Sequence, residues 1–119
     1  MVALEPPPLS VQLELQQTVE EQVEKPQWSS CVTYLRQKWD IPIYGDALFV
    51  SPNISLFEAH RGDVVIFLYG RGVDKSHVAM FDRLGNDGFW VWEYNRKPYV
   101  EEHRLVRFDD PALLGFKRY

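Results

Sequence analysis

Between residues 29 and 42 the hydrophobic positions recur with the spacing of an α-helix. The stripe consists of Cys31, Tyr34, Leu35 and Trp39. Positions three and four residues apart share one face of a helix, so this stripe predicts a helix from about Ser30 to Trp39. Ser30 is a good N-cap residue, and Asp40-Ile41-Pro42 ends the pattern because the residue before a proline disfavours helical geometry.

After residue 60 the pattern changes to short apolar runs separated by turn-forming residues. The expected strands are Val64 to Tyr69, His77 to Asp82, Phe89 to Tyr94, Val100 to Arg107 and Gly115 to Tyr119. The separators Gly70–Lys75 and Leu84–Gly88 are rich in glycine, so successive strands are expected to pair antiparallel. One helix followed by a meander predicts an α+β fold in which the sheet packs on the helix.

The chain divides into an N-terminal arm and one compact domain. With 119 residues and 45% hydrophobic content it has enough apolar material for a single core. We interpret residues 1–26 as an acidic, proline-containing arm or linker that docks on a partner, and residues 27–119 as the domain. Within the arm, residues 11–15 alternate like a short strand and residues 19–23 have weak helical spacing. A disordered acidic tail is the alternative interpretation.

The net charge of -4 comes from the arm, which holds five Glu and one Lys, whereas acidic and basic side chains balance in the domain. Lys and Arg are scattered and form no basic stripe, so we expect no nucleic-acid partner. The sequence contains neither an apolar run of membrane-spanning length nor the pattern of a signal peptide. We therefore expect a protein without a membrane span that is cytoplasmic when made.

The single cysteine is the first candidate for chemistry. Cys31 has no second cysteine with which to form an intramolecular disulfide, so it is a buried thiol, an intermolecular link or a reactive group. In the first turn of the predicted helix it would feel the positive end of the helix dipole. That position favours the thiolate, which is the nucleophilic form.

A base and two orienting groups follow later in the chain. His77 begins a predicted strand, and Glu93 and Asn95 lie two residues apart on the next, so both are expected to share one face beside His77. His60 and His103 stand in charged contexts typical of a solvated surface, and we assign them no role. The histidines and the cysteine lack the spacing of a metal site, so no metal or other cofactor is expected.

Six short motifs follow one another from Cys31 to the C-terminus. They are Cys31-Val32-Thr33-Tyr34, Gly45-Asp46-Ala47, Arg61-Gly62-Asp63-Val64-Val65-Ile66-Phe67, Ser76-His77-Val78-Ala79-Met80, Glu93-Tyr94-Asn95 and Leu114-Gly115-Phe116. In this order they resemble the CHAP family, the cysteine, histidine-dependent amidohydrolases/peptidases, which are similar in fold to papain and to NlpC-type cell-wall peptidases. The resemblance implies a papain-like α+β fold, with an N-terminal catalytic helix packed on an antiparallel sheet of about five strands.

By position, the resemblance implies that Cys31 is the nucleophile, His77 its base, and Glu93 and Asn95 the groups that orient the imidazole. The implied reaction is hydrolysis of amide bonds in peptidoglycan by an amidase or an endopeptidase. A phage lysin, or a virion or tail component that opens the host wall, is the implied setting. Residues 1–26 would contact the protein partner or the assembly, and the enzyme would reach the wall after lysis or as part of a phage particle.

Two positions depart from the family's pattern. Ser30 stands where members often carry Gln, and Ser76 stands where they often carry Gly. Gln27, one helical turn upstream, is a candidate oxyanion donor in place of the missing Gln. These departures leave open a catalytically inactive structural or adaptor protein that retains the fold. A peptidase that acts on protein is a further alternative.

Overall fold

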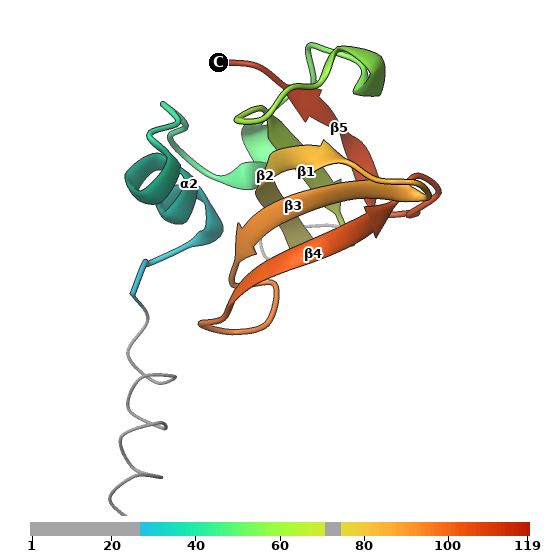
Figure 1. The fold of residues 1–119 in the computed structure, drawn as a ribbon. Coiled ribbons are helices and arrows are strands. Elements are labelled where there is room, and N and C mark those ends of the chain that lie inside the picture. Colours follow the sequence, from blue (N-terminus) through green and yellow to red (C-terminus); the bar gives the residue numbers. More distant parts are fainter. Residues whose placement is uncertain (1–26, 71–74) are drawn as a thin grey trace, which may run out of the picture.

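The structure is a computed structural model that describes residues 27–70 and 75–119 (Figure 1). The predicted arm, residues 1–26, lies outside the described residues, and so do the expectations of a strand and a helix within it. The described part is a small α+β domain with one α-helix and one five-stranded antiparallel sheet. Within these residues, none of the helices is both long enough and apolar enough to cross a membrane.

The predicted helix is present as α2, Cys31–Trp39. Ser30 is its N-cap, and the Ser30 hydroxyl accepts a hydrogen bond from the backbone N–H of Thr33. The helix ends at Asp40, whose left-handed conformation (φ 56) turns its backbone N–H back onto the carbonyl of Leu35. These two caps satisfy backbone groups that a short helix would otherwise leave to solvent.

The five strands keep the predicted sequence order with small shifts at their ends. They are β1 (Val64–Leu68), β2 (Ser76–Leu84), β3 (Gly88–Tyr94), β4 (Glu101–Arg107) and β5 (Leu113–Lys117). Two 3-10 turns, η1 (Ala47–Phe49) and η2 (Leu56–Glu58), lie in the segment between α2 and β1.

The predicted meander is correct for β1 to β4 and wrong for β5. The sheet order is β4-β3-β2-β1-β5, so the last strand pairs with β1 and not with β4. This position brings the ring of Phe116 to 6.2 Å from Phe81 and 5.4 Å from Phe89, measured between ring centroids. Pairing beside β4 would take Phe116 away from this cluster, so burial of its ring explains why β5 crosses to the far edge.

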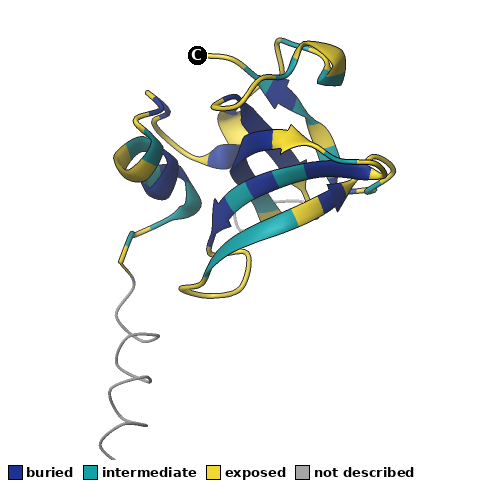
Figure 2. Cartoon of the chain, in the orientation of Figure 1, coloured by how far each residue is buried: buried dark blue, intermediate teal, exposed yellow. Residues whose placement is uncertain are grey.

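Alternating side chains of the central strands bury both faces of the sheet. On β1, Val64 and Ile66 join the cluster that includes α2, whereas Val65 and Phe67 join a second cluster on the opposite face. Figure 2 shows the buried residues concentrated on β1, β2 and β3, with β4 mostly intermediate or exposed. The continuous apolar sequence of β1 therefore marks a strand covered on both sides.

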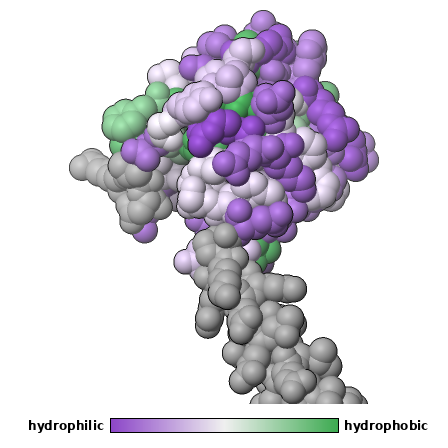
Figure 3. Space-filling model, turned by 90° about the vertical axis from the view of Figure 1, so that its left-hand side faces the viewer, coloured by the Kyte–Doolittle hydropathy of each residue, from purple (hydrophilic) through white to green (hydrophobic). Residues whose placement is uncertain are grey.

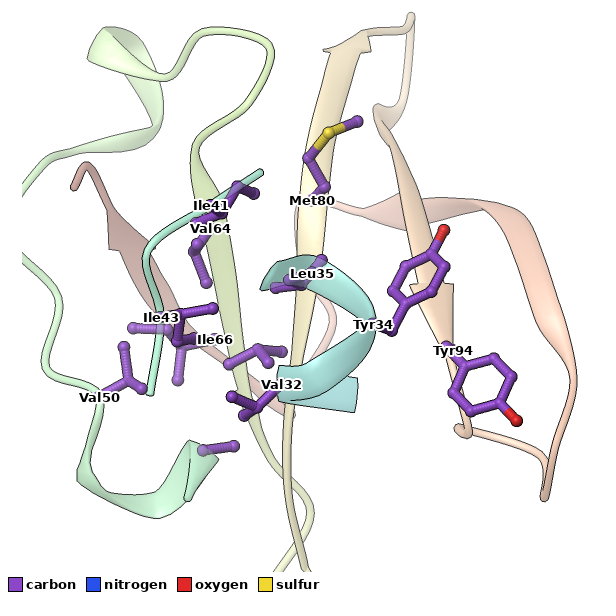
Figure 4. Packing of buried hydrophobic residues seen from close by; sticks show 12 residues of the cluster. Val32, Tyr34, Leu35, Ile41, Ile43, Val50, Val64, Ile66, Met80 and Tyr94 are labelled. Carbon is purple, nitrogen blue, oxygen red and sulfur yellow. The ribbon is translucent and has the colours of Figure 1, made fainter. Parts of the chain in front are cut away.

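The inner face of α2 holds the helix against the sheet. Val32 and Leu35 are buried, and Figure 4 shows them between the helix and the strands behind it. Each such side chain contributes roughly 1.5–3 kcal/mol when fully buried. Tyr34 stacks on Tyr94 of β3 with ring centroids 5.6 Å apart, and Trp28 packs edge-on against both rings. These contacts fix the start of α2 relative to the end of β3.

A β-bulge interrupts the pairing of β2 with β3. Phe81 pairs with Val91 and Arg83 pairs with Trp90, so Asp82 is an extra residue on β2 with no partner of its own on β3. Because side chains alternate along a strand, one extra residue changes which side chains of β2 and β3 share a face.

Candidate active site

Cys31 is the first residue of α2 and its thiol is largely buried against β2. Burial alone would raise the pKa of this thiol. The hydrogen bond and positive charge of His77, together with the backbone N–H groups of Val78 and Val32, outweigh that effect and hold the pKa below its ordinary value. The start of a helix adds to the preference for the thiolate. Cys31 therefore has the environment of a reactive cysteine.

His77 lies near the start of β2 and is 5% exposed. Its ring packs beside two aromatic rings, with centroids 5.9 Å from Phe67 and 6.4 Å from Tyr69. This burial alone would lower the pKa of the imidazole, but hydrogen bonds to Cys31 and Glu93 and the negative charge of both groups raise the pKa to about 9. The ring therefore favours the imidazolium form between a thiolate and a carboxylate.

Glu93 is fully buried on β3, and its Oε1 lies 2.9 Å from Nε2 of His77. Because Nε2 faces the carboxylate, Nδ1 is the nitrogen left to face Cys31. Burial would raise the pKa of Glu93, but hydrogen bonds and positive charge from His77 and Arg104 hold it below its ordinary value. Glu93 thus holds the ring of His77 in one orientation through this contact.

Arg104 of β4 holds the carboxylate from the other side. Its Nη2 donates to Oε1 of Glu93 at 3.0 Å and its Nε donates to Oε2, which makes a two-pronged contact. Arg96 lies further out, with Nε 3.5 Å from Oε2 of Glu93. No local pattern in the sequence indicates this contact of Arg104. Its place opposite Glu93 depends on the register of β3 with β4, in which Val91 pairs with Arg104, and the sequence alone does not fix that register.

The bulge at Asp82 is what puts His77 and Glu93 on the same face. If the register next to the turn, in which Arg83 pairs with Trp90, continued along both strands, Glu93 would pair with Met80 and project from the face opposite His77. Asp82 is 8% exposed. Its carboxylate accepts one hydrogen bond from Nη1 of Arg83 at 2.9 Å and one from Nε2 of His103 at 3.0 Å. These contacts stabilise the bulge at the opposite end of β2 from the site.

Two expectations for side chains near the site differ from the structure. Asn95 follows the end of β3 with a positive φ of 70, so it leaves the strand alternation, and its Oδ1 accepts a hydrogen bond from the backbone N–H of Tyr99 at 3.0 Å. His103 is not a solvated surface residue, because it is partly buried and stacks on Trp92 with ring centroids 4.4 Å apart. His60 is exposed, as its charged context indicated.

A cleft of about 290 Å³ opens beside Cys31. It is lined by Ser30, Cys31, Val32, Gly45, Asp46, Ala47, Ser76, His77 and Asn95. Asn95 therefore borders the same space as Cys31 and His77, whereas the exposed Gln27 is not among the lining residues. The face that carries α2 is mainly hydrophilic, with hydrophobic surface confined to small patches (Figure 3).

Among residues 27–70 and 75–119, no group of three or more His, Cys, Asp or Glu side chains is arranged to hold a metal ion. The comparisons with known proteins add no relative: no family model, curated protein or solved structure matches the chain. The chemistry of the site is therefore argued from its geometry. A thiol, an imidazole and a carboxylate are joined in series at the wall of a cleft, which is the arrangement that nucleophilic catalysis by cysteine requires.

Proposed function

We propose that this protein is a peptidoglycan hydrolase that cleaves amide bonds through Cys31, as an amidase or an endopeptidase. The observation that carries the proposal is the series of Cys31, His77 and Glu93, which ends in a cleft. The resemblance of the six motifs to the CHAP family supplies the substrate class. The proposal also takes the fold to be papain-like, with α2 as the helix that carries the nucleophile and packs on the antiparallel sheet.

The reaction follows from the protonation states that the site favours. The Cys31 thiolate attacks the carbonyl carbon of the amide, forming a C–S bond and placing negative charge on the carbonyl oxygen. When the C–N bond breaks, the His77 imidazolium gives its proton to the leaving amine. His77 then takes a proton from water, the resulting hydroxide attacks the acyl-enzyme, and the carboxylic acid product leaves with Cys31 again a thiolate.

The start of α2 offers a donor for the oxyanion. The first N–H groups of a helix have no acceptor within the helix, and that of Thr33 is taken by the Ser30 hydroxyl. The N–H of Cys31 is therefore the candidate that lies next to the carbon under attack. Ser30 acts as the helix cap in this proposal, which accounts for its presence where the family often has Gln.

The cellular setting belongs to the same proposal. A phage lysin, or a virion or tail component, would act on the host wall after lysis or from within a particle. Residues 1–26 would provide the contact with a partner.

Purified cell-wall sacculi test the proposal directly. We expect the wild-type protein to release soluble fragments and the Cys31→Ala variant to release none, because the nucleophile is lost. Mass spectrometry of the fragments identifies the bond: a new amino terminus within the peptide indicates an endopeptidase, and separation of sugar from peptide indicates an amidase. Thermal unfolding of both proteins controls for loss of the fold.

Full lytic activity in Cys31→Ala would refute the enzymatic role of the cysteine. Absence of lysis by both proteins, together with cleavage of a denatured protein by the wild type alone, would instead identify a peptidase that acts on protein. Inactivity of the wild type on both substrates would favour the structural or adaptor protein.

A further inference from the structure

Asp46 is a charged residue on the wall of the cleft, and its carboxylate has no partner among the described residues. It is the N-cap residue of η1, yet its carboxylate makes no capping hydrogen bond, although Asp is among the residues that cap most readily. Within the described ranges 27–70 and 75–119, no hydrogen bond or ion pair occupies this exposed carboxylate. A carboxylate that neither caps nor pairs is available to a ligand in the cleft.

The charges around the cleft leave Asp46 uncompensated. It is the only carboxylate among the described residues that line the cleft, and none of those residues is Lys or Arg. The thiolate of Cys31 and the imidazolium of His77 offset one another. Behind them, Glu93 is offset by Arg104. Among the described residues that line the cleft, Asp46 is therefore the charge that is not offset, which favours a cationic group on the ligand.

The residues next to Asp46 add apolar surface. Leu48 and Phe49 of η1 are 38% and 74% exposed, and Tyr44, on the other side of Gly45, is 73% exposed. Large apolar side chains so exposed on a short segment that also lines a cleft are suited to contact the hydrocarbon part of a ligand.

We propose that Asp46 is a specificity-determining residue that binds a primary ammonium group carried on an aliphatic stem of the peptide substrate. The side chain of a diamino acid in a peptidoglycan stem peptide has this chemistry. This inference rests on the proposed function, because it names the part of the substrate that the same cleft recognises.

Two peptides that differ only at the amine test the proposal. One is a stem peptide that contains lysine and is still linked to its sugar, and the other is the same molecule with the lysine amine acetylated. We expect wild-type kcat/KM to be about fivefold higher for the free amine, which is the upper end for an exposed ion pair. In Asp46→Asn the ratio should fall close to one, because the rate on the free-amine peptide falls toward that on the acetylated peptide. Asp87→Asn, an exposed change of the same charge outside the cleft, should keep the wild-type ratio.

Binding of the same peptides to Cys31→Ala, measured by calorimetry, separates this inference from the proposed function. In one outcome the wild type hydrolyses neither peptide, the free-amine peptide binds more tightly, and Asp46→Asn removes this difference in affinity. Hydrolysis is then refuted and the role of Asp46 stands. If both peptides are hydrolysed with equal kcat/KM, hydrolysis stands and the role of Asp46 is overturned. Equal binding of two peptides that are not hydrolysed overturns both.

Discussion

Replacing Glu93 with Gln tests whether the buried carboxylate holds His77 in the imidazolium form. The substitution keeps the size of the side chain and an oxygen that can accept a hydrogen bond, but it removes the charge. The pKa of His77 rises from 6.5 to about 9, which corresponds to roughly 3 kcal/mol of preference for the protonated ring. Cys31 and Glu93 both contribute a hydrogen bond and a negative charge to that preference. Loss of the carboxylate should remove up to about half of it, which corresponds to roughly tenfold in the ratio of the thiolate–imidazolium pair to the neutral pair.

Alkylation of Cys31 by iodoacetamide measures that population, because the thiolate is the reacting form. Because a strongly favoured pair changes little in population near neutral pH, the rate is followed across pH. We expect the step at which the imidazolium is lost, about pH 9 in the wild type, to move down by up to about one unit in Glu93→Gln. Glu102→Gln is the matched control: Glu102 pairs with Glu93 across β3 and β4, but its carboxylate binds Arg96. An unchanged pH profile in Glu93→Gln would refute the assignment, and an equal shift in Glu102→Gln would show a general effect of charge.

The same variant should lose stability in a pH-dependent way. Glu93→Gln leaves the partly buried Arg104 without its carboxylate, at a cost of roughly 1–3 kcal/mol. The pKa of Glu93 is lowered in the folded protein, so its stabilising contribution is complete above the ordinary value of 4.5 and is lost as pH falls through the folded value. Urea unfolding should therefore show the largest difference from wild type near neutral pH and a smaller one below pH 4.5. A difference independent of pH would contradict this reasoning.

Two further predictions concern loss of the His77 imidazole and addition of a methyl group at a glycine. In His77→Ala the largest influences that lower the pKa of Cys31 are lost, so its alkylation midpoint should rise toward the ordinary thiol value. A profile identical to wild type would refute activation by His77. In Gly88→Ala the new Cβ would lie 2.0 Å from the carbonyl oxygen of Val106, so we expect thermal unfolding to show a loss of about 3 kcal/mol. Gly45→Ala, with nothing within 4 Å but a φ of +82, should lose only about 1 kcal/mol, and an equal loss in both variants would refute the steric argument.

Local signals were sufficient to predict most of the fold from the sequence. The spacing of Cys31, Leu35 and Trp39 and the cap at Ser30 indicated the helix, because these effects act between residues a few positions apart. The glycine-rich separators likewise indicated β1 to β4 as a meander. The place of β5 was not predictable in this way, because it depends on packing of Phe116 against rings from strands distant in the sequence.

The candidate site likewise contains residues that local signals indicate and residues whose places depend on strand geometry and register. Cys31 and His77 were found from residue type and local position, and the structure joins them as expected. Glu93 and Asn95 were predicted to be equivalent, but only Glu93 continues the strand, since Asn95 adopts a positive φ. Arg104 was missed because an arginine in an acidic surface sequence gives no sign of the carboxylate that register will bring to it.

The bulge explains why local patterns indicate the members of the site but not how they meet. Alternation along a strand says which residues of one strand share a face, but it cannot relate two strands until their register is known. Here the register that unites His77 with Glu93 depends on Asp82, a residue with no contact to either, whose carboxylate is bound by His103 and Arg83. The environment of the Cys31 thiol thus depends on the charged series of His77, Glu93 and Arg104. It also depends on the distant bulge that sets the register of β2 with β3. Because the groups of that series titrate together, alkylation and hydrolysis should share one apparent midpoint, which belongs to the whole series and not to Cys31 alone.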